Sequence, residues 1–327
     1  MMVLQAKERV FPLAAEFKIS RGARTESRVV EVTVEADGIT ALGEAFPYPR
    51  YGESIDSVIT QIDSVAAAIA GGAGRDELQG MLPAGAARNA VDCALWDLEA
   101  KRAGKRVWEL AGIPAPPVLT TAYTLSLDAP EAMGAAAAAQ KARPVLKLKL
   151  AGDGQDEARV AAVRAATPEA KLIVDANEGA KPAEAEALCR ALAKLGVAMI
   201  EQPVAVADDA CLAGFPHPVP LCADESFHTR ADFGKVEGRY DFINIKLDKT
   251  GGLTEALAVA EEAKRRGFRI MTGCMVGSSL AMAPATLVAA QSEIVDIDGP
   301  LLMAKDRENG LTYRGSLVEP PSAKLWG

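Results

Sequence analysis

Histidine is scarce in this chain: His217 and His228 are the only two among 327 residues. A zinc site built from several histidines is therefore almost excluded, and a Ser-His-Asp triad has few candidates. Acid–base chemistry must come mainly from carboxylates and amines.

Cysteines and long apolar runs are also few. The five cysteines are scattered without a C-x-x-C pair, which favours a reduced, cytoplasmic compartment. The first ten residues include Lys7, Glu8 and Arg9, so no apolar signal segment can be drawn. The longest uncharged stretch, 270–292, contains glycines, a proline and polar residues and is a poor membrane span. We expect a soluble cytoplasmic protein without a membrane partner.

Basic residues are outnumbered, 36 against 44 acids, which gives a net charge of −8. A nucleic-acid binder needs a basic footprint, so nucleic acid is excluded as the main partner. A chain of 327 residues is long enough for two domains.

The first domain is expected to be α+β and to span residues 1–113. Residues 28–36 alternate apolar and polar side chains and are followed by the hairpin signal Asp37-Gly38. Helical periodicity follows over 54–70 and 88–103, and the proline-rich 114–117 is the expected linker.

After the linker, short apolar runs alternate with helical segments. Eight runs with seven helical segments predict an α/β fold with a parallel sheet, and their even spacing favours a closed (β/α)7β barrel of the TIM type over 114–300. Residues 301–327 look irregular and are expected to pack back on the first domain. The runs are 119–125, 145–150, 172–174, 199–200, 220–222, 242–245, 269–271 and 294–297.

Chemically active residues follow these runs at intervals of 22 to 27 residues. In a barrel, the carboxyl ends of the strands form the mouth where active sites lie. The residues are Lys149, Asp175, Glu201, Asp224, Lys246, Gly273-Cys274 and Asp296 with Asp298.

Asp175, Glu201 and Asp224 form an expected metal site. Three carboxylates on adjacent strands repel one another unless a cation lies among them, and oxygen ligands suit Mg²⁺. The alternative is that each acid caps the helix that follows it.

Two lysines on opposite sides of the mouth predict epimerisation, because one can remove a proton and the other can return it to the opposite face. Lys147 and Lys149 share one strand face, and Lys246 lies four strands further round. Lys249 competes with Lys246, and an ordinary solvated strand edge is the alternative for the first pair.

Three further features indicate ligand recognition. Asp296 and Asp298 suit an ammonium group, although a simple turn is equally compatible. Arg21 or Arg24 is a candidate to bind a carboxylate in two-point fashion, although a solvated arginine is the default alternative. The loop 47–52, which contains Tyr51, is a candidate lid with a candidate substrate contact.

These residues resemble the enolase superfamily, and within it the muconate-lactonising subgroup. VDIDGP at 295–300 also resembles the D-x-D signature of dipeptide epimerases. The resemblance covers nearly the whole chain and rests on KLKL at 147–150, IVDAN at 173–177, IEQP at 200–203, ADES at 223–226 and NIKLDKTGG at 244–252.

The resemblance implies a capping domain over 1–113 and epimerisation of L-Ala-D/L-Glu through an enediolate, in murein peptide metabolism. It implies one Mg²⁺ per subunit held by Asp175, Glu201 and Asp224. Lys149 and Lys246 would be the acid–base pair and Lys147 would bind the substrate carboxylate. The other implied dipeptide contacts are Thr124, Gly273, Cys274, Met275, Asp296, Asp298 and Arg21 or Arg24.

Alternatives stay open at this point. Cycloisomerases, o-succinylbenzoate synthases and N-acylamino acid racemases share the metal and the lysines, and a non-catalytic binding barrel is a further alternative. Dipeptide breadth and oligomeric state, a homo-oligomer included, are also open.

Overall fold

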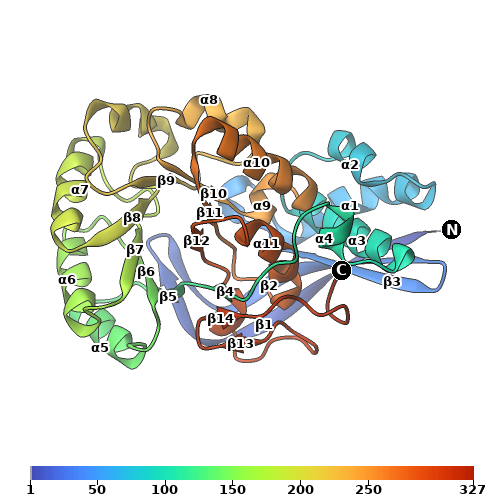
Figure 1. Cartoon of the computed structure of the whole chain (residues 1–327), viewed down its shortest axis with the longest axis horizontal. Helices are drawn as coiled ribbons and strands as arrows, with labels where there is room; N and C mark the ends of the chain where they lie inside the picture. Colours follow the sequence, from blue (N-terminus) through green and yellow to red (C-terminus); the bar gives the residue numbers. More distant parts are fainter. Residues whose placement is uncertain (1) are drawn as a thin grey trace.

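The computed structural model describes residues 2–327 and has two parts, an antiparallel sheet with helices and a ring of parallel strands (Figure 1). The antiparallel sheet consists of β1 (Val3–Ile19), β2 (Gly22–Ala36) and β3 (Ile39–Ala45). Asp37 and Gly38 join β2 to β3 with φ values of 57° and 78°. Two consecutive positive φ values match the favoured two-residue hairpin turn, so the predicted hairpin is confirmed.

Four helices cover this sheet: α1 (Ile55–Ala70), α2 (Arg75–Met81), α3 (Ala86–Ala103) and α4 (Val107–Leu110). The predicted helices over 54–70 and 88–103 are thus confirmed. Ser54 begins α1 as its N-cap, since its hydroxyl accepts from the Ser57 amide. We call the unit from β1 to α4 the cap.

Helix α3 packs against β3 at unusually short range. A Cβ on Gly43 of β3 would collide with the Ala90 carbonyl oxygen and the Ala94 amide of α3. Only glycine permits this approach of two backbones.

The parallel sheet has eight strands in the order β12-β11-β10-β9-β8-β7-β6-β5. Its two edge strands are joined by a hydrogen bond from the Ala122 amide to the Val295 carbonyl oxygen (2.8 Å), so the sheet curls back on itself. This confirms the predicted α/β barrel with an α+β cap. The strands are β5 (Tyr123–Leu125), β6 (Val145–Lys149), β7 (Lys171–Asp175), β8 (Val197–Glu201), β9 (Leu221–Ala223), β10 (Phe242–Ile245), β11 (Arg269–Thr272) and β12 (Ile294–Val295).

One predicted run is divided in the structure. Residues 119–125 form two strands, and only β5 belongs to the barrel. β4 (Leu119–Thr120) instead pairs antiparallel with β14 (Leu317–Val318), which also pairs with β13 (Tyr313–Arg314). The chain turns at Thr121, whose amide binds the Ser316 carbonyl oxygen (2.8 Å).

Helices cover the outside of the barrel (Figure 1). None of those in residues 2–327 is long and apolar enough to cross a membrane. The helices after β5 are α5 (Pro130–Ala139), α6 (Asp156–Ala166), α7 (Ala185–Lys194), α8 (Phe233–Val236), α9 (Leu247–Thr250), α10 (Leu253–Arg266) and α11 (Ser279–Ala289). The chain also has short 3-10 turns, η1 (Pro49–Tyr51) in the cap and, after β7, η2 (Pro182–Glu184), η3 (Val206–Gly214), η4 (Arg230–Asp232) and η5 (Gly299–Leu302).

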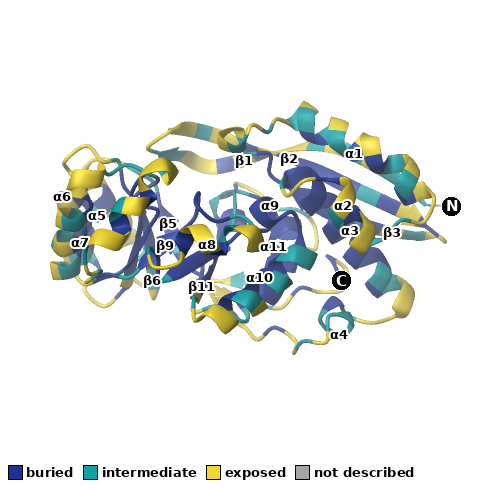
Figure 2. Ribbon diagram, turned by 90° about the horizontal axis from the view of Figure 1, so that it is seen from above, coloured by how far each residue is buried: buried dark blue, intermediate teal, exposed yellow. Residues whose placement is uncertain are grey.

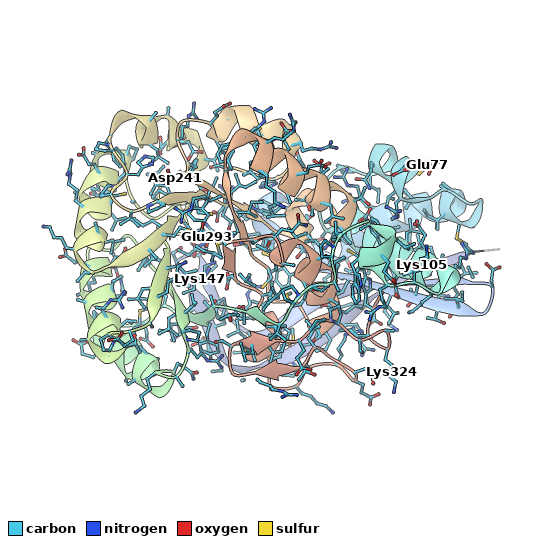
Figure 3. All side chains as sticks on the ribbon, viewed as in Figure 1. Glu77, Lys105, Lys147, Asp241, Glu293 and Lys324 are labelled. Carbon is cyan, nitrogen blue, oxygen red and sulfur yellow. The ribbon has the colours of Figure 1, made fainter. Side chains whose placement is uncertain are left out.

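The barrel interior begins with an apolar layer to which nearly every strand contributes one side chain. Because strand side chains alternate between faces, the residue two positions later also points inward. At that next level the charged residues begin, and Figure 3 shows Lys147 inside the ring of strands. The apolar layer consists of Ala122, Ile173, Met199, Cys222, Phe242, Met271 and Ile294.

The C-terminal segment returns to the cap. Trp326 is fully buried, and its indole NH donates to the Cys93 carbonyl oxygen of α3 (3.0 Å). The Gly327 amide donates to Asp97 of the same helix (2.7 Å). Figure 2 shows the other extension, the β1–β2 hairpin, whose exposed end reaches from the cap over the barrel.

Candidate active site

Three buried carboxylates lie side by side at the carboxyl ends of β7, β8 and β9. Asp175 and Glu201 are the last residues of their strands and are paired in register. Asp224 directly follows β9. Each is at most 2% exposed, so the strand ends bring together the three acids predicted as metal ligands.

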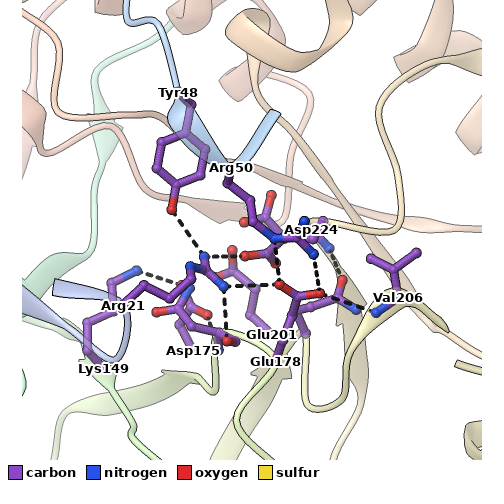
Figure 4. A network of polar contacts seen from close by, with 12 residues as sticks. Arg21, Tyr48, Arg50, Lys149, Asp175, Glu178, Glu201, Val206 and Asp224 are labelled. Carbon is purple, nitrogen blue, oxygen red and sulfur yellow. Dashed lines mark hydrogen bonds and ion pairs between the residues drawn. The ribbon is translucent and has the colours of Figure 1, made fainter. Parts of the chain in front are cut away.

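Three lysine amines compensate this charge. Lys147 Nζ lies 2.6 Å from Glu201 Oε2 and 3.5 Å from Asp175 Oδ2. Lys149 Nζ donates to Asp175 Oδ2 and Lys246 Nζ donates to Asp224 Oδ2, each at 2.6 Å. Figure 4 shows part of this arrangement from close by.

Burial and neighbouring charge set the pKa values in the cluster. Burial, together with the charge of Asp175, raises the pKa of Glu201 to about 7. Burial also acts to raise the pKa of Asp175, but the Lys149 and Lys147 ammonium groups outweigh it and bring that pKa to about 2. Burial lowers the pKa of Lys246, but the Asp224 and Glu201 carboxylates outweigh burial and raise it well above its ordinary value.

The donor set fits a hard divalent cation. Glu201 Oε2 is buried and makes no hydrogen bond, because its contact with Lys147 lacks hydrogen-bond geometry. Carboxylate oxygens are the ligands that Mg²⁺ prefers. Within residues 2–327, no three His, Cys, Asp or Glu side chains have the spacing of a metal site, and each of the three acids contacts a lysine amine.

A pocket opens above the carboxylates, between the barrel mouth and the cap. Asp175 and Glu201 lie below its floor, while Tyr51 and Gly273 lie outside its lining. Tyr51 instead stacks edge-on against the His228 ring at 4.5 Å. The predicted residues that line the pocket are Arg21, Arg24, Thr124, Lys147, Lys149, Asp224, Lys246, Cys274, Met275, Asp296 and Asp298.

Several lining residues were not among the sequence candidates. Asn177 and Glu225 lie next to predicted positions, in DAN and ADES, and that adjacency was the only available signal. Phe17 comes from β1 of the cap, and its place depends on how the cap meets the barrel. Tyr48 belongs to the loop 47–52 that was predicted as a lid.

Asp296 and Asp298 occupy one side of the pocket. Asp296 Oδ2 accepts from Lys147 Nζ (2.8 Å), and its buried Oδ1 makes no hydrogen bond. Asp298 Oδ2 accepts from the Thr124 amide (2.7 Å). Burial and the charge of Asp296 raise the pKa of Asp298 to about 7.

The two candidate arginines differ in their partners. Arg21 is paired with Glu225 (2.6 Å) and Glu178 (3.1 Å). Arg24 lies over the Phe46 ring, 5.0 Å from its centroid, and pairs with no carboxylate among the described residues.

Lys249, the competitor of Lys246, is fully buried below the pocket. Its ammonium donates to Asp224 Oδ1 and the Asp224 carbonyl oxygen, both at 2.6 Å. It also donates to the Phe227 and Asn244 carbonyl oxygens. An amine with all its protons engaged in this way supports Asp224 and leaves Lys246 as the lysine that lines the pocket.

Two family models match the chain. Residues 3–112 match the mandelate racemase/muconate lactonizing enzyme N-terminal domain, and residues 131–322 match the enolase C-terminal domain-like family.

Similar proteins are isomerases of amino acid derivatives. The L-Ala-D/L-Glu epimerase of Escherichia coli K12 is 48% identical over 96% of this chain and 98% of its own. The N-acetyl-D-glutamate racemase of a Pseudoalteromonas species is 47% identical over 87% of this chain and 90% of its own.

Solved structures share the fold. An enolase family member from Agrobacterium tumefaciens with homology to dipeptide epimerases, bound to sodium and L-Ala-L-Glu, superposes with a TM-score of 0.97, 53% identity and full coverage of both chains. A dipeptide epimerase from Enterococcus faecalis with Mg and L-Leu-L-Tyr gives a TM-score of 0.90 at 27% identity, covering 97% and 96% of the two chains. The chain therefore belongs to the enolase superfamily, in its mandelate racemase and muconate lactonizing enzyme family.

Proposed function

We propose that this protein is a Mg²⁺-dependent dipeptide epimerase that interconverts L-Ala-L-Glu and L-Ala-D-Glu. The observation that carries the proposal is the pair Lys149 and Lys246, which face one pocket from β6 and β10, four strands apart. Such a pair can reach one carbon from two sides. The similarity to an L-Ala-D/L-Glu epimerase supports this substrate.

The two lysines exchange a proton at the α-carbon of the Glu residue. A neutral amine on one side accepts the α-proton, and the ammonium on the other side delivers a proton to the opposite face. For the opposite epimer the two lysines exchange these roles. The charge left on the substrate spreads into its carboxylate as an enediolate.

Asp175, Glu201 and Asp224 would hold one Mg²⁺ per subunit. When bound, the ion supplies positive charge that acidifies the carbon beside a carboxylate. Lys147, buried among Glu201 and Asp296, adds a fixed positive charge for the substrate carboxylate.

Asp296 and Asp298 would bind the substrate ammonium group, for which the unpartnered Asp296 Oδ1 is an open acceptor. Arg24 would bind the Glu side-chain carboxylate, because Arg21 already has two carboxylate partners. A guanidinium without a partner binds a carboxylate in two-point fashion. Murein peptides in the cytoplasm are the proposed source of the dipeptide.

Racemisation of N-acetylglutamate is the second candidate. The N-acetyl-D-glutamate racemase among the relatives favours it. In addition, the pKa of about 7 lets Asp298 carry a proton near neutrality and donate it to an acetyl oxygen.

A direct test follows both substrates by NMR in D₂O with Mg²⁺. We expect deuterium at the Glu α-carbon of L-Ala-L-Glu, accompanied by L-Ala-D-Glu. Exchange confined to N-acetyl-L-glutamate would favour the second candidate, and exchange of neither substrate would reject both.

Asp298→Asn should reduce dipeptide turnover at least about tenfold, since it removes a charge from the ammonium site.

A further inference from the structure

One carboxylate of the barrel joins two loops of the cap. Glu178, in the segment after β7, accepts from Arg50 Nε (3.0 Å) and Nη2 (2.8 Å) and from Arg21 Nη1 (3.1 Å). Arg21 lies in the turn between β1 and β2, and we call this hairpin tip, residues 19–24, the first cap loop. Arg50 lies in the second cap loop (residues 47–52). Figure 4 shows both guanidinium groups converging on this side chain.

Both loops cover the pocket. Ile19, Arg21 and Arg24 line it from the first cap loop, and Tyr48 lines it from the second. The loops also contact each other, because Arg21 Nη2 donates to the Tyr48 hydroxyl (3.1 Å). The two loops therefore form part of the cap side of the pocket.

Glu178 is more buried than either of its arginine partners. Its side chain is 10% exposed, against 42% for Arg50 and 27% for Arg21. The Val206 amide donates to Glu178 Oε1 (3.2 Å), and the Glu178 amide donates to the Gln202 carbonyl oxygen (2.9 Å). Glu178 also has a φ of 67°, a left-handed conformation that is uncommon for a residue with a side chain.

The two loops depend on Glu178 to different degrees. Arg21 has a second anchor in Glu225 (2.6 Å), whereas Arg50 pairs with no other carboxylate in residues 2–327. The second cap loop is thus fastened to the barrel by one bidentate ion pair and the Tyr51–His228 stacking. Bidentate pairs of this kind are stronger and more specific in geometry than single ion pairs.

We propose that Glu178 is a clasp that holds both cap loops closed over the pocket. It is a positioning residue for the reaction proposed above, on which this inference rests, and it does not touch the substrate. Weakening the clasp populates open loops, so that substrate binding must also drive closure. The apparent affinity is then the affinity of the closed state multiplied by the fraction of molecules that are closed. The closed complex reacts as before.

The test uses Glu178→Gln and Arg50→Gln, with Glu255→Gln as matched control. Glu255 of α10 also binds an arginine bidentately, Arg230, and its side chain is 11% exposed. Hydrogen exchange followed by mass spectrometry reports loop opening without any substrate. In Glu178→Gln we expect at least about threefold faster exchange over residues 47–52 and a smaller increase over 19–24, where Glu225 still holds Arg21. In Arg50→Gln we expect the threefold increase over 47–52 alone, and in the control no change.

Kinetics give the second readout. In both variants we expect the KM for L-Ala-L-Glu to rise about three- to tenfold while kcat stays within about twofold. The double variant should add little to Glu178→Gln, since that single variant already removes the partner of Arg50. Arg50 is largely exposed, so Arg50→Gln remains informative if Glu178→Gln does not fold.

Two outcomes must be told apart. Unchanged loop exchange and unchanged KM in both variants would overturn the clasp. If the wild-type protein epimerises neither substrate, the proposed function fails, and the exchange measurement alone then decides whether Glu178 holds the loops.

Discussion

Lys149 and Lys246 differ in exposure within one pocket: Lys246 is 6% exposed, and Lys149 is half-buried. Each is expected to serve one epimer. Lys149→Ala and Lys246→Ala should therefore each abolish epimerisation, a loss of at least about a thousandfold. A single variant should still exchange the α-proton of one epimer, which ¹H NMR in D₂O detects.

Lys181→Ala is the control for this experiment, since Lys181 is highly exposed and lies outside the pocket. Full epimerisation by either pocket variant would contradict the two-lysine assignment. So would exchange of the same epimer by both variants.

At the residue scale, the local sequence pattern was enough to locate the residues at the strand ends. Period-two alternation and the end of an apolar run place Asp175 and Glu201 at the barrel mouth without further information. The same reasoning did not separate Arg21 from Arg24, because both lie in one short loop. Their difference depends on Glu178 and Glu225, more than 150 positions away in sequence.

Helices α3 and α10 meet at Asp92, the junction of cap and barrel. Asp92 accepts from the Thr254 amide (3.0 Å) and from Gln79 Nε2 (3.1 Å). Burial raises its pKa to about 6, so the folded state binds this proton more tightly than the unfolded chain. The resulting stability is present at low pH and is lost as pH rises from about 4 to about 6.

Asp92→Asn should remove the loss of stability that Asp92 causes as the pH rises. The free energy of unfolding of the variant, relative to wild type, should rise by about 2 kcal/mol between pH 4.5 and 7.5, as measured by urea unfolding. Gln79 Oε1 is buried without a partner and can accept from the new amide after a flip. A pH-independent difference would show that Asp92 does not titrate in this range.

At the element scale, capped helices and the hairpin were predictable, because their signals are local. Ser54 begins α1, Gly104 ends α3 with a φ of 61°, and Asp37-Gly38 forms the turn. The division of 119–125 was not predictable, since β4 pairs with β14, almost 200 residues later.

Trp326 joins the end of the chain to the cap. Trp326→Ala should lower the free energy of unfolding by about 4 kcal/mol, since it empties a fully buried site and removes the indole donor to the Cys93 carbonyl oxygen. Trp108→Ala is the control. Trp108 is only half-buried beneath Arg106, so we expect a loss of about 1 kcal/mol. Equal losses in chemical unfolding would contradict the role of Trp326.

At the scale of the whole molecule, net charge was a poor guide to recognition. The chain carries a net charge of −8, yet a second, outer pocket between the two cap loops is lined by three arginines, Arg21, Arg24 and Arg50. Local charge at the entrance determines which ligand approaches, and that arrangement follows from the fold.

The barrel has a seam where its first and last strands meet. A single backbone hydrogen bond crosses it at Ala122, with side-chain bonds from the Thr124 amide to Asp298 and from the Ile297 amide to the Thr121 hydroxyl. The proposed ammonium site, Asp296 and Asp298, lies at this seam. A bound dipeptide would therefore contact residues from both ends of the sheet. A ligand that contacts both ends would then stabilise the ring against opening at this seam, because it binds only where the two ends meet.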